Sequence, residues 1–443
     1  VALTPTASID VSGVGAGGTA LIGGDYKGGN AAVQNATQTT IAAGAIIKAD
    51  ALENGHGGRV IVWSNDKTYF DGLISARGGE YGGDGGFVET SGHSLKFTGR
   101  VDTRAPMGKW GNWLIDPDVV CMVGVGPVCP MSFGAIPIVP ADTVIDATQI
   151  LSILSTSDAD ISATTLIAVL NSFNLVASGI TPNGRTLSLT APHILFDGQI
   201  DMTAAGFGTG NGNFNITASG TPLTPAALGG PASIGKLVIA PEARIRANSG
   251  TMTLRADSEI QVTGPTSPGI QLDMGSGGII FRAPTLTAVT GPSGAPTLQS
   301  DYFGLWTNSI GGNASPSASV VDMDIGPYSA TASLYLGLAS SDPLCAAGNL
   351  CLNTANSGNL SVSGGMWMVS NNNLTVSTAY SFTAPSHVAL GARNNLVLNA
   401  PLTVMAIGTA SYLPLSMYAG NQFINNPGGS ISLEPMSPYW GLI

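Results

Sequence analysis

Charged residues are scarce in this sequence, and basic ones more so than acidic ones. Of 443 residues, 16 are Lys or Arg and 27 are Asp or Glu, which leaves a net charge of −11. No window gathers the Lys and Arg that a phosphate backbone requires, so nucleic acid is excluded as a partner, as is a polybasic membrane anchor. Apolar runs of about 18 residues, the length of a membrane-spanning helix, are absent too. The most apolar window, 133–145, is interrupted by Pro137 and Pro140.

Aromatic residues are also few, at 6% of the chain, which argues against a core built on large rings. The hydrophobic fraction is nevertheless 44%, mostly Ala, Val, Ile and Leu, so the composition is not that of a disordered chain. Glycine is abundant, with 60 residues. Small, β-branched and uncharged residues together favour regular, tightly stacked strands.

Cysteine is limited to two close pairs, Cys121 with Cys129 and Cys345 with Cys351. Close and even pairing predicts two small disulfide loops and an oxidising compartment. Buried free thiols are the alternative. A zinc site is the least favoured interpretation, because neither pair has His or further Cys nearby to complete four ligands.

One phrase recurs along the chain: a short apolar strand, a corner at Ala-Pro or Ala-Asp, and a second strand. Within each copy, apolar and polar residues alternate, as in a strand with one buried face. The copies recur at intervals of roughly 15 to 28 residues, which is a solenoid period. We therefore predict an all-β fold, a right-handed parallel β-helix. The clearest copies are Leu237–Ala247, Met252–Val262, Ile279–Val289 and Leu396–Ala406.

Two segments depart from this alternation. Asp146–Leu154 and Ala163–Phe173 place apolar residues at helical spacing and predict one or two short helices inserted between coils, with Asp146 as an N-cap. Gly291–Asp342 is richer in Ser, Pro and Gly and predicts longer loops. The predicted organisation has five parts: an N-terminal block at 1–120, the first Cys loop and helical insertion at 121–180, coils at 181–290, loop-rich coils with the second Cys pair at 291–357, and C-terminal coils with a cap at 358–443.

The N-terminal quarter carries a dense, ordered series of phrases. They are Gly23–Gly28, Ile47–Trp63, Ile74–Gly79, Gly85–Gly92, Val101–Pro106 and Trp113–Pro117. This series resembles the filamentous-haemagglutinin-type exoproteins of two-partner secretion. The resemblance is dense over 23–117 and looser over 142–203, and beyond that it depends on the β-helix repeat alone. The secretion domain that precedes such blocks in the family, with its Asn-Pro-Asn phrases, is missing, so the chain resembles a processed, mature body.

The resemblance implies a parallel β-helix that is secreted to the bacterial cell surface through an outer-membrane partner pore. We expect a non-enzymatic extracellular structural protein, a rigid subunit or shaft of a surface fibre that assembles head-to-tail with copies of itself and serves attachment. The alternative is a monomeric surface adhesin that binds a host receptor or a glycan. A polysaccharide-degrading β-helix enzyme is a remote third.

An enzyme of this fold would need paired carboxylates around its substrate. Gly55–Gly57, with His56 at its centre, resembles the Gly-His-Gly of galacturonan hydrolases, but no two Asp residues are adjacent anywhere in the chain. The same residues occupy a Gly-rich turn of the family phrase, so a turn is the favoured interpretation. No catalytic residue and no cofactor is predicted. The remaining histidines, His93, His193 and His387, are expected at the surface or at corners.

Two pairs of carboxylates are candidates for calcium ligands. Asp322 and Asp324 alternate and should project from one face of a strand, and Asp197 and Asp201 lie near a Gly-rich loop. Isolated Asp residues on solvated faces or at corners are commoner, so no metal site is predicted.

The ends of a β-helix present unpaired strand edges, which bind other strands unless they are capped. The first residues look strand-like and carry no strong cap, which makes Ile9 and Val11 candidate assembly contacts. Near the other end, Tyr439 and Trp440 favour a cap, with a subunit contact as the alternative. Head-to-tail stacking would pair the free backbone groups and produce an open filament.

Overall fold

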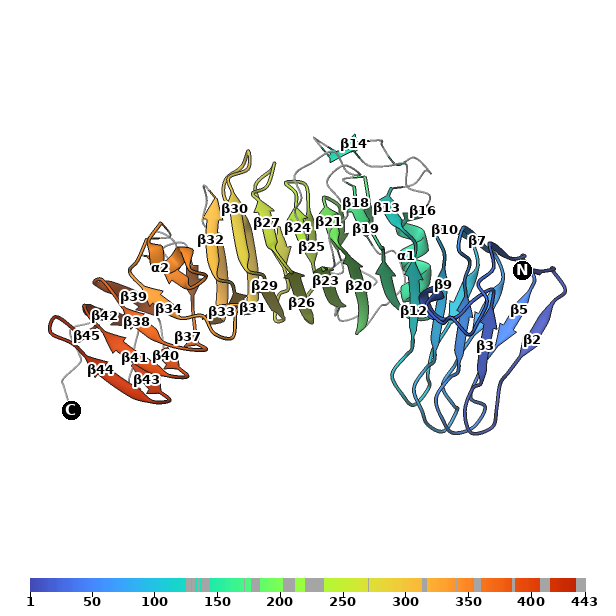
Figure 1. Cartoon of the computed structure of the whole chain (residues 1–443), viewed down its shortest axis with the longest axis horizontal. Helices are drawn as coiled ribbons and strands as arrows, with labels where there is room; N and C mark the ends of the chain where they lie inside the picture. The colour runs from blue at the N-terminus through green and yellow to red at the C-terminus, as the bar shows by residue number, and fades with distance from the viewer. Residues whose placement is uncertain are drawn as a thin grey trace. The chain divides into compact units, whose positions relative to one another are not determined.

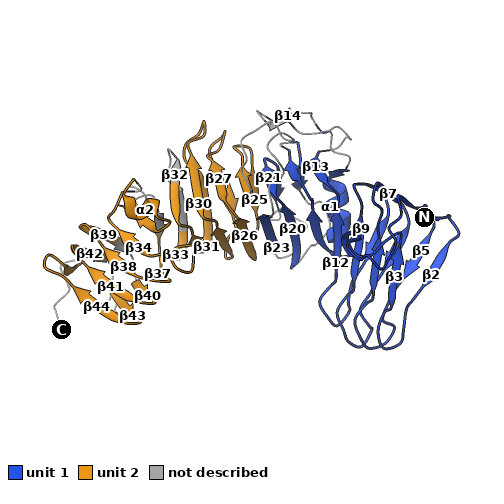
Figure 2. Cartoon of the chain, viewed as in Figure 1, with its two compact units in different colours: residues 1–235 blue, residues 236–443 orange. Residues whose placement is uncertain are grey.

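The structure is a computed structural model of the whole chain (Figure 1). It describes residues 1–124, 129, 132–133, 136–137, 143–170, 172–176, 184–201, 212–219, 235–269, 271–312, 317–339, 341–353, 360–384, 387–406 and 415–435. The chain divides into two compact units, unit 1 at Val1–Gly235 and unit 2 at Lys236–Ile443 (Figure 2), and each is described by itself.

Unit 1 is a parallel β-helix in which successive coils add one strand each to shared sheets (Figure 1). One sheet runs through the whole unit, each strand hydrogen-bonded in parallel to the next. Its strands are β3 (Thr19–Ile22), β6 (Arg59–Val62), β9 (Phe87–Ser91), β12 (Asn112–Asp116), β17 (Asp158–Ser162), β20 (Arg185–Ala191) and β23 (Gly212–Ala218).

The other sheets of unit 1 are shorter. The first coils build a sheet of β1 (Ala2–Leu3), β4 (Gln38–Ile41), β7 (Lys67–Phe70) and β10 (Ser94–Phe97), and another of β2 (Ser8–Asp10), β5 (Ile46–Lys48), β8 (Leu73–Ser75) and β11 (Arg100–Asp102). Later coils contribute β13 (Val119–Val123), β16 (Thr143–Asp146), β18 (Leu166–Val169) and β21 (His193–Phe196), the parallel pair β19 (Asn174–Val176) and β22 (Gln199–Asp201), and the antiparallel pair β14 (Ser132–Phe133) and β15 (Ile136–Pro137).

Stacking of like residues in register forms the core of these coils. Ile47, Ile74 and Val101 pair in successive strands, and their exposed fractions are 0%, 0% and 1%. Alternate residues point outward, as the period-2 pattern predicts. The core also admits large rings: Trp113 is 2% exposed and packs edge-on against Phe97, with ring centroids 5.4 Å apart.

One predicted helix is confirmed. Helix α1 (Ala147–Leu154) follows β16, and Asp146 caps it by accepting from the backbone N–H of Gln149 at 2.9 Å. The Gln149 side chain in turn accepts from the backbone N–H of Asp146, completing a capping box. Among the described residues, no helix is long and apolar enough to cross a membrane.

The helix predicted over Ala163–Phe173 is wrong, because Leu166–Val169 form strand β18 with all four residues buried. The outer face of this strand is covered by its own apolar cluster, in which Leu166 and Ala168 pack with Cys121. The disulfide from Cys121 to Cys129 closes this cluster. A short strand that is buried on both faces has a continuous apolar run, and the periodicity of such a run does not distinguish it from a helix.

Unit 2 is also a parallel β-helix. One sheet contains β24 (Lys236–Ile239), β27 (Glu259–Thr263), β30 (Thr285–Val289) and β32 (Ser309–Gly312). The long sheet contains β26 (Thr251–Ala256), β29 (Gly278–Arg282), β31 (Thr297–Trp306), β33 (Ser317–Gly326), β37 (Gly365–Ser370), β40 (His387–Ala392) and β43 (Leu415–Ala419). The first residues of its two longest strands have further partners: β31 pairs with β28 (Leu272–Asp273), which pairs with β25 (Arg244–Arg246), and β33 pairs with β36 (Leu360–Val362). The remaining sheets contain β34 (Leu334–Leu336), β35 (Leu350–Leu352), β38 (Leu374–Val376), β41 (Asn395–Leu398) and β44 (Gln422–Asn425), and β39 (Tyr380–Ala384), β42 (Pro401–Ala406) and β45 (Ser430–Pro435).

Residues Gly291–Asp342, which the sequence predicts to form longer loops, contain more regular strands than expected. Strands β31 and β33 each have ten residues and pair along most of their length. The irregular part follows β33, where the chain inserts β34, helix α2 (Pro343–Ala346) and β35 before it returns to the sheet at β36 and β37, which both pair with β33.

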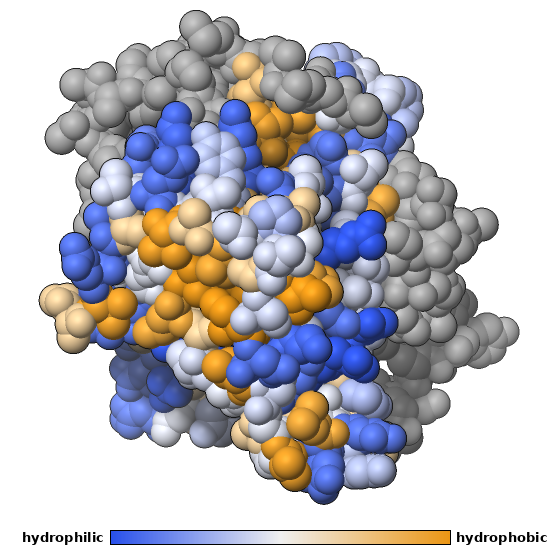
Figure 3. Space-filling view, turned by 90° about the vertical axis from the view of Figure 1, so that its right-hand side faces the viewer, coloured by the Kyte–Doolittle hydropathy of each residue, from blue (hydrophilic) through white to orange (hydrophobic). Residues whose placement is uncertain are grey.

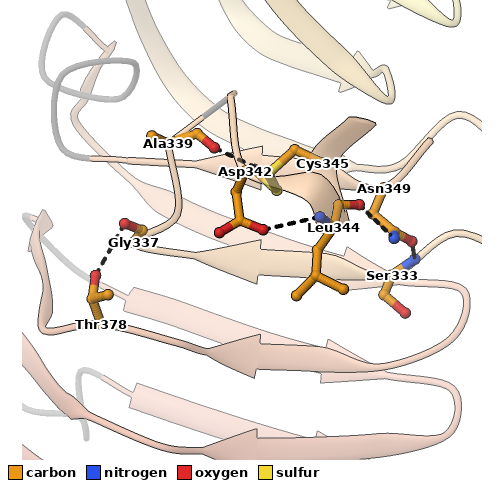
Figure 4. The surroundings of a disulfide bond; sticks show 9 residues. Ser333, Gly337, Ala339, Asp342, Leu344, Cys345, Asn349 and Thr378 are labelled. Carbon is orange, nitrogen blue, oxygen red and sulfur yellow. Dashed lines mark hydrogen bonds between the residues drawn. A yellow bond between two sulfur atoms is a disulfide. The ribbon is translucent and has the colours of Figure 1, made fainter. Parts of the chain in front are cut away.

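The second disulfide ties α2 to β35 through Cys345 and Cys351 (Figure 4). The same loop is held by Asn349, whose amide donates to the carbonyl of Leu344 at 2.8 Å and accepts from the N–H of Ser333 at 2.8 Å. Asp342 caps α2 by accepting from the N–H of Leu344 at 2.9 Å. Both predicted disulfides are therefore present, and each closes a short loop, with sequence separations of 8 and 6 residues.

Removing the second disulfide should have a modest effect. A variant with Cys345→Ala and Cys351→Ala should unfold in unit 2 at a free energy lower by about 2 kcal/mol, because the cross-link restricts only a short loop of the unfolded chain. Thermal unfolding with and without a reductant measures this. The reductant should lower the stability of the wild type and leave the same region of the variant unchanged.

Candidate functional site: the open ends of the coils

The first coil of unit 1 leaves strand edges open. Among the described residues, β1 pairs only with β4, and β2 pairs only with β5. Leu3 and Ile9 point into the core, since they pair with Ile41 and Ile47, which are fully buried. They are nevertheless only half-buried, as is Val11. Figure 3 shows this face, with apolar residues gathered across its middle.

The opposite edge of the same two sheets is closed. There α1 and its flanks form hydrogen bonds to the strand edges, so β10 and β11 are not left open. Thr143 Oγ1 accepts from the N–H of Leu95 at 2.9 Å, and Gln149 Nε2 donates to the carbonyl of Phe97 at 2.9 Å. Thr156 Oγ1 donates to the carbonyl of Val101 at 2.6 Å. Among the described residues, β1 and β2 are therefore the open edge of these two sheets, and β10 and β11 are the covered edge.

The last described coil of unit 2 is open in the same way. Phe423, Ile431 and Leu433 occupy inward positions, yet their exposed fractions are 48%, 40% and 43%. The difference arises from position, because each pairs with a residue of the preceding coil that has 0% exposure. These partners are Leu396, Leu402 and Val404.

Side-chain amides also stack toward this open coil. Asn394 Nδ2 donates to Asn373 Oδ1 at 3.0 Å, and one coil further Asn421 Nδ2 donates to Asn395 Oδ1 at 3.0 Å. Each step points the amide nitrogen at the preceding coil. Within the part of the chain that the structure describes, the series ends at Asn421, whose amide oxygen is an acceptor.

Of the four predicted assembly contacts, Ile9 and Val11 lie at the open edge of unit 1. Tyr439 and Trp440 lie outside the described residues. Sequence reasoning missed Leu3 and the apolar side chains of the last coil. Their alternation with polar residues was the signal, but alternation does not reveal which coil is terminal.

A loop covers the outer face of the long sheet of unit 1. In this covering loop, 23–37, Lys27 has a positive φ of 51°, an uncommon conformation for a residue other than glycine. Its backbone N–H donates to both carboxylate oxygens of Glu89, at 3.0 and 3.2 Å, and its Nζ lies 3.1 Å from Asp116 Oδ2. Outward residues below it, such as Ile61, are consequently fully buried.

The covering loop buries acidic groups around one cation. Glu89 is fully buried and Asp116 is 4% exposed. Burial raises the pKa of Glu89 to about 7, although hydrogen bonds from Lys27 and Ser91 act in the opposite direction. Burial also raises the pKa of Asp160, which accepts from Asn112 Nδ2 at 3.4 Å. Lys27 is thus one cation that holds the loop on the sheet, and Arg59 of β6, whose Nη2 lies 2.9 Å from Asp25 Oδ1, is another.

Glycines stack at one corner of unit 1 because the coils approach closely there. A Cβ at Gly86 would lie 2.1 Å from the carbonyl oxygen of Gly58, and one at Gly111 would lie 1.9 Å from that of Gly86. These stacked glycines form the floor of an open groove of about 520 Å³, and Trp110 lies in its wall. The guanidinium of Arg185 lies 3.7 Å from the Trp110 ring centroid.

His56 lies in the loop between β5 and β6. Its side chain is 71% exposed, and its Nδ1 accepts from the N–H of Asp84 in the next coil at 2.9 Å. His93 bonds to Asp118 at 2.5 Å on the surface, while His193 and His387 begin β21 and β40.

The carboxylate pairs also have defined places. Asp322 and Asp324 project from one face of β33, as predicted, and accept from Gly365 N and Tyr302 Oη respectively, each at 2.8 Å. Asp197 is 4% exposed, and Asp201 ends β22. Across the described ranges, no three potential metal ligands gather in a group.

Comparison with known proteins adds no assignment: no protein-family model matches the chain, and no curated protein matches its sequence.

Proposed function

We propose that this chain is a non-enzymatic extracellular structural protein, a β-helical subunit or shaft of a bacterial surface fibre that assembles head-to-tail with copies of itself. The observation that carries the proposal is the in-register parallel stacking of coils in each unit, which places like apolar residues one above another. Inward residues that are fully buried one coil away, at Ile47 and Leu402, have half-exposed counterparts at Ile9 and Ile431. A stacked copy would bury them and pair the free strand edges.

Other features support this proposal. The charge-poor composition and the amide series ending at Asn421 suit repeated stacking of like coils. Two disulfides suit an oxidising, extracellular location. The resemblance of 23–117 to filamentous-haemagglutinin-type exoproteins supports export through an outer-membrane partner pore. His56, the residue closest to an enzyme motif, holds a turn.

The assembly has a direct test in the last coil. A variant with Ile431→Asp and Leu433→Asp should lose self-association, because stacking would bury two carboxylates without partners. Sedimentation velocity and electron microscopy over a concentration series should show end-to-end species for the wild type and single particles for the variant. Ser432→Asp is the matched control, since it places the charge on the outer face of the same strand, β45, and should assemble normally.

A wild-type chain that stays monodisperse at every concentration would contradict head-to-tail assembly. So would equal association of the double variant and the wild type. Circular dichroism of all three proteins establishes that the β-helix is retained.

A further inference from the structure

One outer face of unit 2 concentrates aromatic rings, although the chain as a whole has few. The face belongs to the sheet of β29, β31, β33 and β37, and its outward residues are fixed by register. Tyr302 stands between Gly278 and Asp322, and Trp306 between Arg282 and Gly326. In the next strand, Trp367 pairs with Asp324 and completes the outward set. We call these residues the aromatic face.

The rings of the aromatic face lie over glycine backbone. A Cβ at Gly326 would stand 2.7 Å from Cζ3 of Trp306, and one at Gly365 would stand 2.4 Å from Cη2 of Trp367. Side chains at either glycine would displace the ring. The glycines thus let the rings rest against the sheet, where Trp306 and Trp367 are half-buried and keep part of each ring at the surface.

Carboxylates lie between the rings and are held in place. Asp324 accepts from Tyr302 Oη at 2.8 Å, and Asp322 accepts from the N–H of Gly365 at 2.8 Å. Burial and the bond to Asp324 raise the pKa of Tyr302 to about 12, so its hydroxyl remains a donor. Each of these bonds engages one carboxylate oxygen, and the other is a strong acceptor for a ligand hydroxyl.

The cations on the face are few. Arg282 lies with its guanidinium 5.8 Å from the Trp306 ring centroid, and the His387 ring is 6.3 Å from the Trp367 ring. One Arg against two Asp gives no excess of positive charge for an anionic polymer. The Asp residues also interrupt the apolar surface that a lipid membrane would require, and the strands are already paired on both sides, which leaves no edge for a peptide strand.

We propose that the aromatic face binds a neutral, extended polysaccharide. Sugars present C–H groups on their faces, which pack against the electron-rich faces of aromatic rings, and hydroxyl donors at their edges, which the carboxylates accept. Trp306 and Trp367 are two strand spacings apart along the stacking direction, about 9.6 Å, and two residues apart along the strands, about 7 Å, because Trp367 is in register with Asp324 and Gly304. One sugar chain that crosses the strands obliquely would therefore contact both rings, about 12 Å apart, with Asp324 beside its path.

The test uses the full chain and cellohexaose, a neutral oligosaccharide, with a panel of other neutral hexasaccharides. Binding followed by titration calorimetry and by tryptophan fluorescence should be lost or weakened about tenfold in Trp306→Ala and in Trp367→Ala. Trp367→Tyr should retain most of the affinity, because a ring is kept. Tyr81→Ala removes an exposed ring in unit 1 and should leave binding unchanged.

Three results would overturn the proposal: no binding of the wild type to any neutral oligosaccharide, preferential binding of anionic polygalacturonate, or equal binding by the alanine variants. Asp324→Asn should weaken binding while it leaves the fold intact, which separates a ligand contact from a packing role. The proposal does not depend on head-to-tail assembly, since the coil-end variants leave the aromatic face unchanged. Polysaccharide binding and self-association can therefore each be disproved without affecting the other.

Discussion

Replacing Lys27 by Met should destabilise unit 1 by about 3 kcal/mol at pH 8. The side chain carries the cation beside Asp116, and its loss leaves that carboxylate buried next to Glu89 with no compensating charge. Removing one partner of a buried ion pair costs about 3 to 5 kcal/mol of folding stability. We expect the low end of this range, because the Lys27 side chain is 38% exposed. Met keeps the apolar stem and the backbone N–H that binds Glu89, so the change removes the charge together with the hydrogen bond from Nζ to Ser162 Oγ.

Hydrogen exchange of β9 and β12, with limited proteolysis of the covering loop, measures the effect locally. Lys27→Arg should recover much of the stability, since a cation returns. Lys96→Met, at an exposed position of β10, is the matched control and should have little effect. A covering loop that stays equally protected in Lys27→Met would show that the ion pair does not hold it.

The second large effect concerns pH. Because burial raises the pKa of Glu89 from 4.5 to about 7, the folded state retains a proton that the unfolded state releases between these values. The stabilisation is therefore complete below pH 4.5 and is lost as the pH rises through about 7. A pKa shift of this size can contribute at most about 3 kcal/mol to the free energy of unfolding. The shift of Asp160 has the same direction.

The Glu89→Gln substitution isolates this contribution from the rest of the chain. Other carboxylates, such as Asp102 beside Arg104, have lowered pKa values and give the opposite dependence. The informative quantity is the difference in stability between wild type and variant. Because the amide stays neutral at every pH, this difference should grow in favour of the variant from about pH 5 to about pH 8. A difference that does not change with pH would contradict the assignment.

Local patterns were sufficient to predict much of the fold. Period-2 alternation in Leu237–Ala247 predicted what the structure shows as β24 and β25, and the position of Asp146 before an apolar helical pattern predicted α1. The prediction failed at Ala163–Phe173 because the second buried face depends on Cys121 and Cys129, which are distant in sequence. The periodicity of apolar residues in a segment does not show which distant residues cover it.

The sites were harder to predict, because they depend on which coil lies beside which. Lys27 contacts Glu89 and Ser162, which lie 62 and 135 residues away. The aromatic face joins Trp306 and Trp367 across a long insertion. Alternate placement of Tyr302, Gly304 and Trp306 in one strand was a visible signal, but its partners appear only when the register is known.

The helix α1 also has a mechanical consequence. Hydrogen bonds between coils run along the stacking direction, so a pull in that direction is shared by all the sheets of a coil. At α1 two of those sheets end, and the described connections to their last strands are chiefly side-chain bonds from Thr143, Gln149 and Thr156. Under tension, we therefore expect unit 1 to yield first beside its only described α-helix, while the coils on either side stay intact.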